Sequence, residues 1–261
     1  MNQATSNIKK ISRILSAIIV LTAFIAMLAI PSGAAGTDFN PKSTQEAFNT
    51  AQKSHQFLCI LFYDKKDENY RAMENEMTNF VKKSPQKILT YQVVTTNPKE
   101  TDTIAKYRIN QAPLPVLLVF APNRAVTGGF PQRVSEEQLT KCLVSDLMMN
   151  ILKPIQDGKI TLVLLQNKKT KFNKESTAAA NEFSKETGIK GNVAIVKADP
   201  NEPQNQEFWR RYIPETELSE AVIISILSTG QIAGIYKGKT SKEALLEGIT
   251  SALNSRGCCG G

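Results

Sequence analysis

The segment covering residues 107–120 restricts the possible folds of this chain more than any other stretch. It begins with residues of helical character, is interrupted by Pro113 and Pro115, and continues as the apolar run Val116–Phe120. A short apolar run next to turn-forming residues is typical of a strand that a sheet buries on both faces. Because proline has no N–H to donate to a neighbouring strand, we expect Pro115 to occupy the first position of this strand.

Apolar periodicity predicts alternating strands and helices in the first half of the chain. We expect strands at residues 57–63, 88–94 and 125–130 in addition to Val116–Phe120, and helices at residues 43–53, 68–83 and 100–107. Ser135 and Gln138 have the spacing of a capping box, which predicts a long helix from Ser135 to Leu152 that Pro154 ends. The predicted order after the first helix is therefore β-α-β-α-β-β-α.

The same pattern returns in the second half. Strands are expected at residues 160–165, 192–197, 222–227 and 231–236, and helices at 175–187, 208–213 and 240–253. Matching landmarks keep a nearly constant separation, which is 103 residues from Phe57 to Ile160, 102 from Pro98 to Pro200, 106 from Val116 to Val222 and 105 from Ser135 to Thr240. A near-constant offset indicates two copies of one domain.

Three short motifs of the first copy, in this order of elements, resemble the second half of a thioredoxin domain. They are Asn97-Pro98, the sequence Lys106-Tyr107-Arg108-Ile109, and Leu114-Pro115-Val116 ahead of the apolar strand. The resemblance implies an α/β fold of two tandem thioredoxin-like domains, each a central mixed sheet flanked by helices. It also implies a cis Leu114–Pro115 bond, which proline makes less costly. In that family the neighbourhood of this proline faces the substrate, so the resemblance implies a partner-binding groove at Leu114, Pro115 and Val116.

The N-terminal residues have the form of a secretory signal peptide. Lys9, Lys10 and Arg13 precede an uncharged, mostly apolar run at residues 14–30, and small residues suited to cleavage follow. The alternative is an uncleaved membrane anchor, since the run is near the minimum length for crossing a bilayer. Both forms predict an exported protein, periplasmic or secreted, that contacts a membrane only if the segment is retained.

The chain is accordingly divided into a signal peptide or anchor at residues 1–36, a first thioredoxin-like domain at 37–153, a second at 154–254 and a Cys-Cys tail at 255–261. Loss of residues 1–36 removes three positive charges and no acidic ones, which lowers the formal net charge from +8 to +5. The remaining basic residues are interspersed with acidic ones, as in Lys65-Lys66-Asp67-Glu68, rather than clustered. Composition and export therefore argue against nucleic acid as a partner.

Neither copy carries the Cys-x-x-Cys motif that catalytic thioredoxins place at the start of the helix after the first core strand. There the helix terminus stabilises the attacking thiolate. The first copy has residues 65–70 at this place and the second has residues 169–173, and none of these is a cysteine. The second copy also has Ala221 where the first has Pro115. Neither is expected to be an ordinary dithiol oxidoreductase.

Three other residues have chemically capable side chains in settings that favour structural roles. His55 is the only histidine, which excludes a site with several histidine ligands, and its place before a strand favours a surface or capping role. Cys59 lies in an apolar strand and Cys142 on an apolar helix face, where cysteines are usually small buried hydrophobes. A disulfide between Cys59 and Cys142 is an open alternative, because the sequence does not specify their geometry.

Cys258 and Cys259 differ because they lie between glycines at the end of the sequence. Glycine gives the backbone freedom and chain ends are normally accessible. Residues 257–260 resemble the Gly-Cys-Cys-Gly end of the cysteine-type thioredoxin reductases, where such a pair shuttles electrons, and a Cys-Cys tail also occurs in mercuric reductases. The sequence has no dinucleotide-binding Gly-x-Gly-x-x-Gly, so flavin and nicotinamide are not carried over and no cofactor is expected.

The tail suits two kinds of chemistry. Adjacent Cα atoms are ~3.8 Å apart, below the usual disulfide range of roughly 4.4–6.8 Å, and strained exposed disulfides are labile and oxidising. In the reduced state, the two thiolates suit Cu(I), Zn(II) or Hg(II). The leading hypothesis is thiol–disulfide exchange at Cys258 and Cys259, with the folded copies binding a protein partner. The alternatives are a non-catalytic protein-binding scaffold and a soft-metal carrier that uses the same two cysteines.

Overall fold

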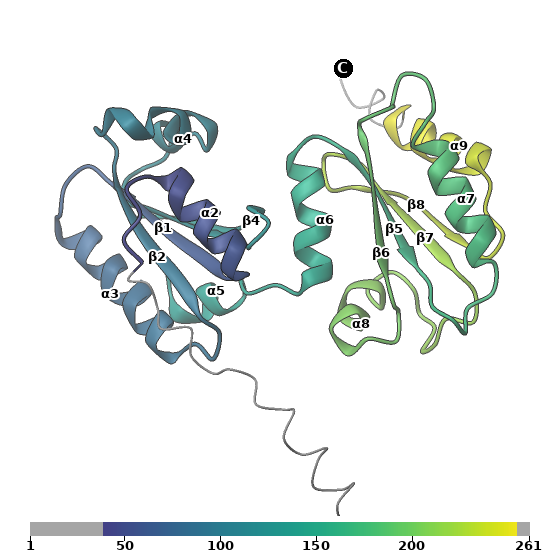
Figure 1. The fold of residues 1–261 in the computed structure, drawn as a ribbon, viewed down its shortest axis with the longest axis horizontal. Helices are drawn as coiled ribbons and strands as arrows, with labels where there is room; N and C mark the ends of the chain where they lie inside the picture. The colour runs from purple at the N-terminus through teal and green to yellow at the C-terminus, as the bar shows by residue number, and fades with distance from the viewer. Residues whose placement is uncertain (1–38, 255–261) are drawn as a thin grey trace, which may run out of the picture. The chain divides into compact units, whose positions relative to one another are not determined.

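The computed structural model describes residues 39–254 of the 261-residue chain (Figure 1). The first repeat contains, in chain order, α2 (Thr44–Ser54), β1 (Phe57–Tyr63), α3 (Glu68–Lys83), β2 (Ile88–Val94), the 3-10 turn η1 (Pro98–Glu100), α4 (Thr101–Lys106), the 3-10 turn η2 (Ile109–Gln111), β3 (Val116–Phe120), β4 (Val126–Pro131) and α5 (Glu136–Thr140). The second repeat contains α6 (Asp146–Gln156), β5 (Ile160–Leu165), α7 (Asn173–Phe183), β6 (Val193–Ala198), α8 (Pro203–Trp209), β7 (Val222–Ile226), β8 (Ile232–Lys237) and α9 (Lys242–Asn254).

The two sheets have the same strand order and the same strand directions. The order is β2-β1-β3-β4 in the first sheet and β6-β5-β7-β8 in the second. In the first sheet, β1 pairs with β2 in parallel and with β3 antiparallel, and β3 pairs with β4 antiparallel. The second sheet repeats this, with β5 parallel to β6 and antiparallel to β7, and β7 antiparallel to β8. This is the topology of the thioredoxin fold, so the predicted class, α/β with two tandem thioredoxin-like domains, is confirmed.

A local irregularity recurs at the repeat separation. The pairing of β3 with β4 shifts register between Val119 and Phe120, and the pairing of β7 with β8 shifts between Ser225 and Ile226. Bulges of this kind bend a strand and increase its twist. Their recurrence shows that the two copies share details of geometry as well as the order of elements.

The predicted long helix from Ser135 to Leu152 is wrong, because the chain forms two helices there. The predicted capping box between Ser135 and Gln138 is present and opens α5, but α5 ends at Thr140. Ser145 then accepts a hydrogen bond from the Met148 N–H and opens α6, which continues through Pro154 to Gln156. Two separate caps therefore replace one long helix.

Helix α6 holds the place in the second repeat that α2 holds in the first. It packs against β5 and β6, as α2 packs against β1 and β2. Ser43 caps α2 by accepting from the Glu46 N–H, which matches the cap that Ser145 provides. This equivalence groups α6 with the second repeat, whereas the sequence division set the boundary at residues 153–154; the domain boundaries themselves stay predictions.

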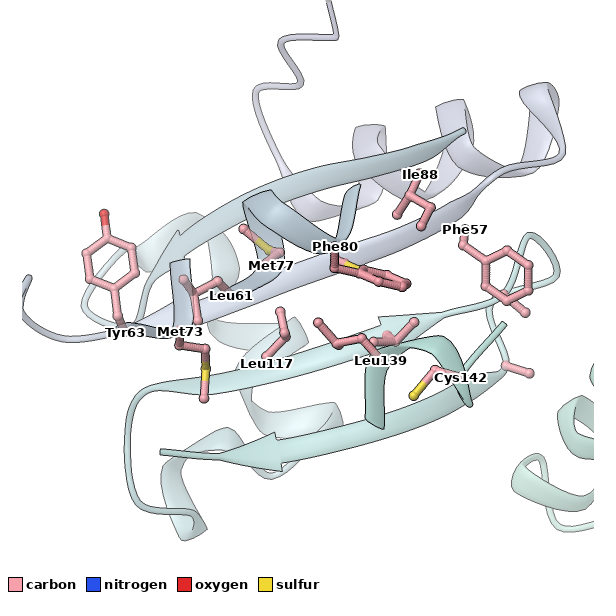
Figure 2. Close-up of a cluster of buried hydrophobic side chains, with 14 of the residues drawn as sticks. Phe57, Leu61, Tyr63, Met73, Met77, Phe80, Ile88, Leu117, Leu139 and Cys142 are labelled. Carbon is pink, nitrogen blue, oxygen red and sulfur yellow. The ribbon is translucent and has the colours of Figure 1, made fainter. Parts of the chain in front are cut away.

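The central strands β1 and β3 are buried along their whole length, as their apolar runs predict. Figure 2 shows the cluster that α3 and the α5 region cover, which contains Leu61, Met73, Met77, Phe80, Leu117, Leu139 and Cys142. In the second repeat, Trp209 lies in the cluster on one face of the sheet and Phe183 in the cluster on the other. Within residues 39–254, no helix has the length and apolar character required to cross a bilayer.

Candidate functional site

In the first repeat, the position of the family's dithiol lies in the loop between β1 and α3. Asp67 caps α3, and its carboxylate accepts a hydrogen bond from the Tyr70 N–H at 3.0 Å. The Lys66 ammonium lies 5.6 Å and 5.2 Å from the ring centres of Tyr63 and Tyr70. A carboxylate therefore occupies the positive end of the helix dipole, where a catalytic thioredoxin stabilises its thiolate.

A closed hydrogen-bond network lies next to this loop and joins α3 to β2. The Tyr70 hydroxyl donates to Glu74 Oε1 at 2.6 Å, and Gln92 Nε2 donates to the same oxygen at 2.7 Å. The hydrogen bond from Tyr70 lowers the pKa of Glu74, while burial raises the pKa of Tyr70. Because both shifts keep the proton on the phenol at neutral pH, this network is suited to holding α3 in place rather than to acid–base chemistry.

The Leu114–Pro115 peptide bond is cis, as the resemblance implied. Strand β3 begins one residue after Pro115, at Val116. Pro115 and Val116 are buried, and Leu114 is half-buried. The Pro115 carbonyl accepts a hydrogen bond from the Gln132 N–H at 2.7 Å. The partner-binding role of Leu114, Pro115 and Val116 stays a prediction, and of the three only Leu114 has a partly exposed side chain.

In the second repeat, backbone hydrogen bonds tie the equivalent loop to the segment ahead of β7. The Lys171 N–H donates to the Ser219 carbonyl at 3.0 Å, and the Ala221 N–H donates to the Lys171 carbonyl at 2.8 Å. Lys171 and Glu220 thereby form a parallel bridge. The loop is bonded to Ala221, the residue that stands in the place of Pro115, so these backbone groups are not available to an extended substrate.

The sequence interpretation missed a polar network that fixes this loop of the second repeat. Asn167 Nδ2 donates to Asp199 Oδ1 at 2.8 Å, Asn173 Nδ2 donates to the Asn167 carbonyl at 2.6 Å, and the Thr170 hydroxyl donates to Asn173 Oδ1 at 2.7 Å. The available signal is the density of short amide and hydroxyl side chains, which favour hydrogen bonds within loops. The hydrogen bonds of this network join residues of the second repeat to one another and hold the loop in place.

Cys59 and Cys142 are free thiols inside the first repeat. Their exposed fractions are 0% and 3%, and Cys142 Sγ donates to the Gln138 carbonyl at 3.3 Å. Burial raises the pKa of Cys59 to about 12 and that of Cys142 to about 11. Since the thiolate is the nucleophilic form, neither residue is reactive near neutral pH. The prediction that both are buried hydrophobes is confirmed. The structure contains no disulfide between Cys59 and Cys142, so that alternative is wrong.

His55 terminates α2, in agreement with the capping role expected from the sequence. Its backbone is left-handed, with φ 53°, and its N–H bonds to carbonyls of the last turn of α2. The equivalent position of the second repeat is Gly158, with φ 79°. Glycine is the residue that adopts this conformation most readily, so the two copies make the same turn with different residues.

Cys258 and Cys259, the predicted catalytic and metal-binding residues, lie outside the described residues. Between residues 39 and 254, no three or more His, Cys, Asp or Glu side chains are grouped so that they could hold a metal ion. The structure therefore tests neither role of the tail, and both stay hypotheses.

No protein-family model matches the sequence, and a comparison with curated proteins finds no match. Similar solved structures include the N-terminal NTD_N/C domain of alkylhydroperoxide reductase AhpF from Enterococcus faecalis, with 15% identity over 81% of this chain and 100% of that chain and a TM-score of 0.28. The first two thioredoxin domains of Naumovozyma dairenensis Eps1p are 12% identical over 83% of this chain and 98% of that chain, with a TM-score of 0.31. Human ERp44 is 13% identical over 81% of this chain and 57% of that chain, with a TM-score of 0.34.

TM-scores this low carry no argument about what the chain does. The fold assignment depends instead on the strand order and directions that both sheets share. The two repeats therefore have the thioredoxin fold, and neither has a cysteine at the position of the family's dithiol.

Proposed function

We propose that this is an exported protein whose thioredoxin-like repeats bind a protein partner and whose Cys258–Cys259 pair carries out thiol–disulfide exchange. The burial of Cys59 and Cys142, with the raised pKa values that burial causes, is the observation that supports this most strongly. Exchange requires an accessible thiolate. The sequence has four cysteines, so thiol chemistry of this chain falls to the tail pair.

The proposed exchange transfers two electrons. A thiolate of the tail attacks one sulfur of a partner disulfide, which forms a mixed disulfide and releases the other partner sulfur as a thiolate. The second tail cysteine then attacks the mixed disulfide, which forms the Cys258–Cys259 bond and releases the remaining partner thiolate. The reverse sequence oxidises a partner dithiol and returns the tail to its reduced form. The lability of a disulfide between adjacent residues suits this cycling in both directions.

A second candidate function is a non-catalytic protein-binding scaffold. It is favoured because, in both repeats, non-redox residues stand where catalytic thioredoxins have their two cysteines. In the first repeat a carboxylate caps α3, and in the second the loop is bridged to Glu220. Neither arrangement leaves a group that performs redox chemistry. The soft-metal carrier remains a third proposal that uses the same two tail cysteines.

An insulin-reduction assay with dithiothreitol as the electron donor tests the proposed exchange. The double variant Cys258→Ser/Cys259→Ser is expected to fall to the uncatalysed rate, because it removes both attacking sulfurs. The matched control Cys59→Ala/Cys142→Ala also removes two thiols, but these are buried, and it should keep the wild-type rate as long as it remains folded.

Three results distinguish the proposals. An unchanged rate in the tail double variant would refute exchange at the tail. No catalysis by the wild type, with partner binding that survives truncation after residue 254, would identify a scaffold. About one equivalent of bound Zn(II) that is lost on the same truncation would identify a metal carrier.

A further inference from the structure

Strand β6 is the outer strand of the second sheet. Among residues 39–254 it pairs only with β5, so one of its two edges is open within the described part of the chain. The Ile160 N–H donates to the Asn192 carbonyl, and the Gln166 N–H donates to the Ala198 carbonyl, at the two ends of this pairing. Every second residue of a parallel strand bonds to a given neighbour. The residues that face β5 are therefore the even-numbered ones from 192 to 198.

The odd-numbered residues of β6 direct their backbone groups away from the sheet. These residues are Val193, Ile195 and Lys197, and no residue between 39 and 254 forms a hydrogen bond with their N–H or carbonyl groups. An edge of this kind is a template for an added strand. Its unpaired groups supply the main-chain hydrogen bonds by which extended peptides join sheets.

A groove of about 440 Å³ lies beside β6, between this strand and α6. Figure 1 shows α6 alongside β6, in the same repeat. One side of the groove is formed by the end of α6 and the residues that follow it, namely Lys153, Asp157 and Lys159. The other side is formed by residues 194–197 of β6. An added strand would therefore have side-chain contacts next to its backbone contacts.

The charge around the groove is mainly positive. Lys153, Lys159 and Lys197 line it, and Asp157 is the only acidic residue of the lining. The Asp157 carboxylate pairs with Lys153 at 2.5 Å, which neutralises both groups. Lys159 and Lys197 form no ion pair with any residue that the structure describes. Two lysines without an ion-pair partner among the described residues therefore flank the open strand edge. Lys159 lies on the α6 side, and Lys197 lies on the face of β6 that it shares with Val193 and Ile195.

We propose that β6 is a docking strand for an extended acidic segment of a partner protein. The segment adds to the second sheet through the outward groups of Val193, Ile195 and Lys197, and its carboxylates pair with Lys159 and Lys197. A second copy of this chain is a poorer occupant, because its own β6 carries Lys197 and no acidic side chain that could pair with Lys159 and Lys197. Lysines on edge strands are a known means of preventing such self-pairing.

This inference deepens the proposed function, because it rests on the protein partner and assigns that partner a surface and a charge. It does not depend on the tail cysteines. Loss of insulin reduction would leave it intact, and loss of peptide binding would leave thiol–disulfide exchange intact.

Fluorescence anisotropy with two labelled peptides tests the proposal on the full mature chain. The probes alternate valine with four glutamates or with four lysines, so they share length and strand propensity and differ in charge. We expect the acidic peptide to bind at low salt, with an affinity that falls as salt rises, and the basic peptide to bind at least tenfold more weakly. Failure of the acidic peptide to bind, or equal binding of both, would overturn the proposal.

A proline substitution isolates the contribution of the edge. Ile195→Pro removes an outward N–H that the β5 pairing does not use, so the fold is retained, which circular dichroism checks. We expect it to weaken binding of the acidic peptide at least tenfold. The matched control is Thr90→Pro on β2, because Thr90 pairs with Cys59 as Ile195 pairs with Leu162. Equal losses in the two variants, or no loss in Ile195→Pro, would contradict docking at β6.

A charge reversal tests the occupant. The variant Lys159→Glu/Lys197→Glu is expected to reject the acidic peptide and bind the basic one. Wild-type protein that dimerises with rising concentration, and loses this in Ile195→Pro, would show instead that a second copy occupies the edge, and the acidic partner would be discarded.

Discussion

Replacing Trp209 with alanine is expected to lower the free energy of unfolding by about 3–5 kcal/mol. The side chain is 1% exposed and lies in the cluster on the α6 and α8 face of the second sheet. Its indole N–H donates to the Pro200 carbonyl at 3.0 Å, so the substitution leaves both a cavity and a buried carbonyl without its donor. Urea denaturation followed by circular dichroism measures the change, because this is the only tryptophan of the chain and the variant loses its fluorescence.

The conservative variant Trp209→Phe separates the two parts of this effect. It keeps most of the apolar volume and removes the N–H, so a loss of about 1–2 kcal/mol is expected from the unpaired Pro200 carbonyl and a small remaining gap. A loss below 1 kcal/mol for Trp209→Ala would show that the side chain does not have the buried environment described above.

Replacing Gly128 with alanine is expected to destabilise the first repeat by about 1–3 kcal/mol through overpacking. A Cβ at this position would lie 2.3 Å from Cys142 Sγ and 2.9 Å from the Phe130 ring. The Cys142 side chain cannot move freely, since its Sγ is hydrogen-bonded to the Gln138 carbonyl and is itself buried. Thermal unfolding of the single variant gives the size of the effect.

A double-mutant cycle shows whether the sulfur causes this destabilisation. Adding Cys142→Ala removes the nearest atom, so the double variant should be less destabilised than the sum of the two single variants. The control is Gly129→Ala on the same strand, whose Cβ would lie 3.1 Å from a Leu118 methyl and is expected to cost less. Strict additivity of Gly128→Ala and Cys142→Ala would contradict the packing described here.

The fold could be read from the sequence because its strongest signals are local. The apolar runs of β1 and β3 are long enough to exclude an exposed position, and their recurrence about 105 residues later identifies the repeat. The break between α5 and α6 could not be read in this way. Apolar residues recur every four positions through this region, as in a single helix, at Leu139, Leu143, Leu147 and Ile151. In the structure, Leu139 belongs to the core of the first repeat and Leu147 to that of the second.

Some features of the candidate sites are likewise visible in the sequence, and others depend on contacts between residues far apart in the chain. The lack of a Cys-x-x-Cys is visible in the sequence, and so is a cis proline once the motifs around Leu114–Pro115 are recognised. The bridge between Lys171 and Glu220 joins residues far apart in the chain, and no spacing predicts it. The open edge of β6 is equally hidden, because an apolar run does not show which strand will be outermost; Lys197 is the only local hint.

Pulse alkylation of the native protein near pH 8, with and without prior reduction and with peptide mass mapping, tests the central claim most directly. At that pH the thiols of Cys59 and Cys142 are almost entirely protonated, because burial raises the pKa of both well above 8. We predict that the reduced protein is labelled rapidly at Cys258 and Cys259, and at Cys59 and Cys142 only after denaturation or at much higher pH. Rapid labelling of Cys59 or Cys142 in the native state, with an unreactive tail, would contradict the account.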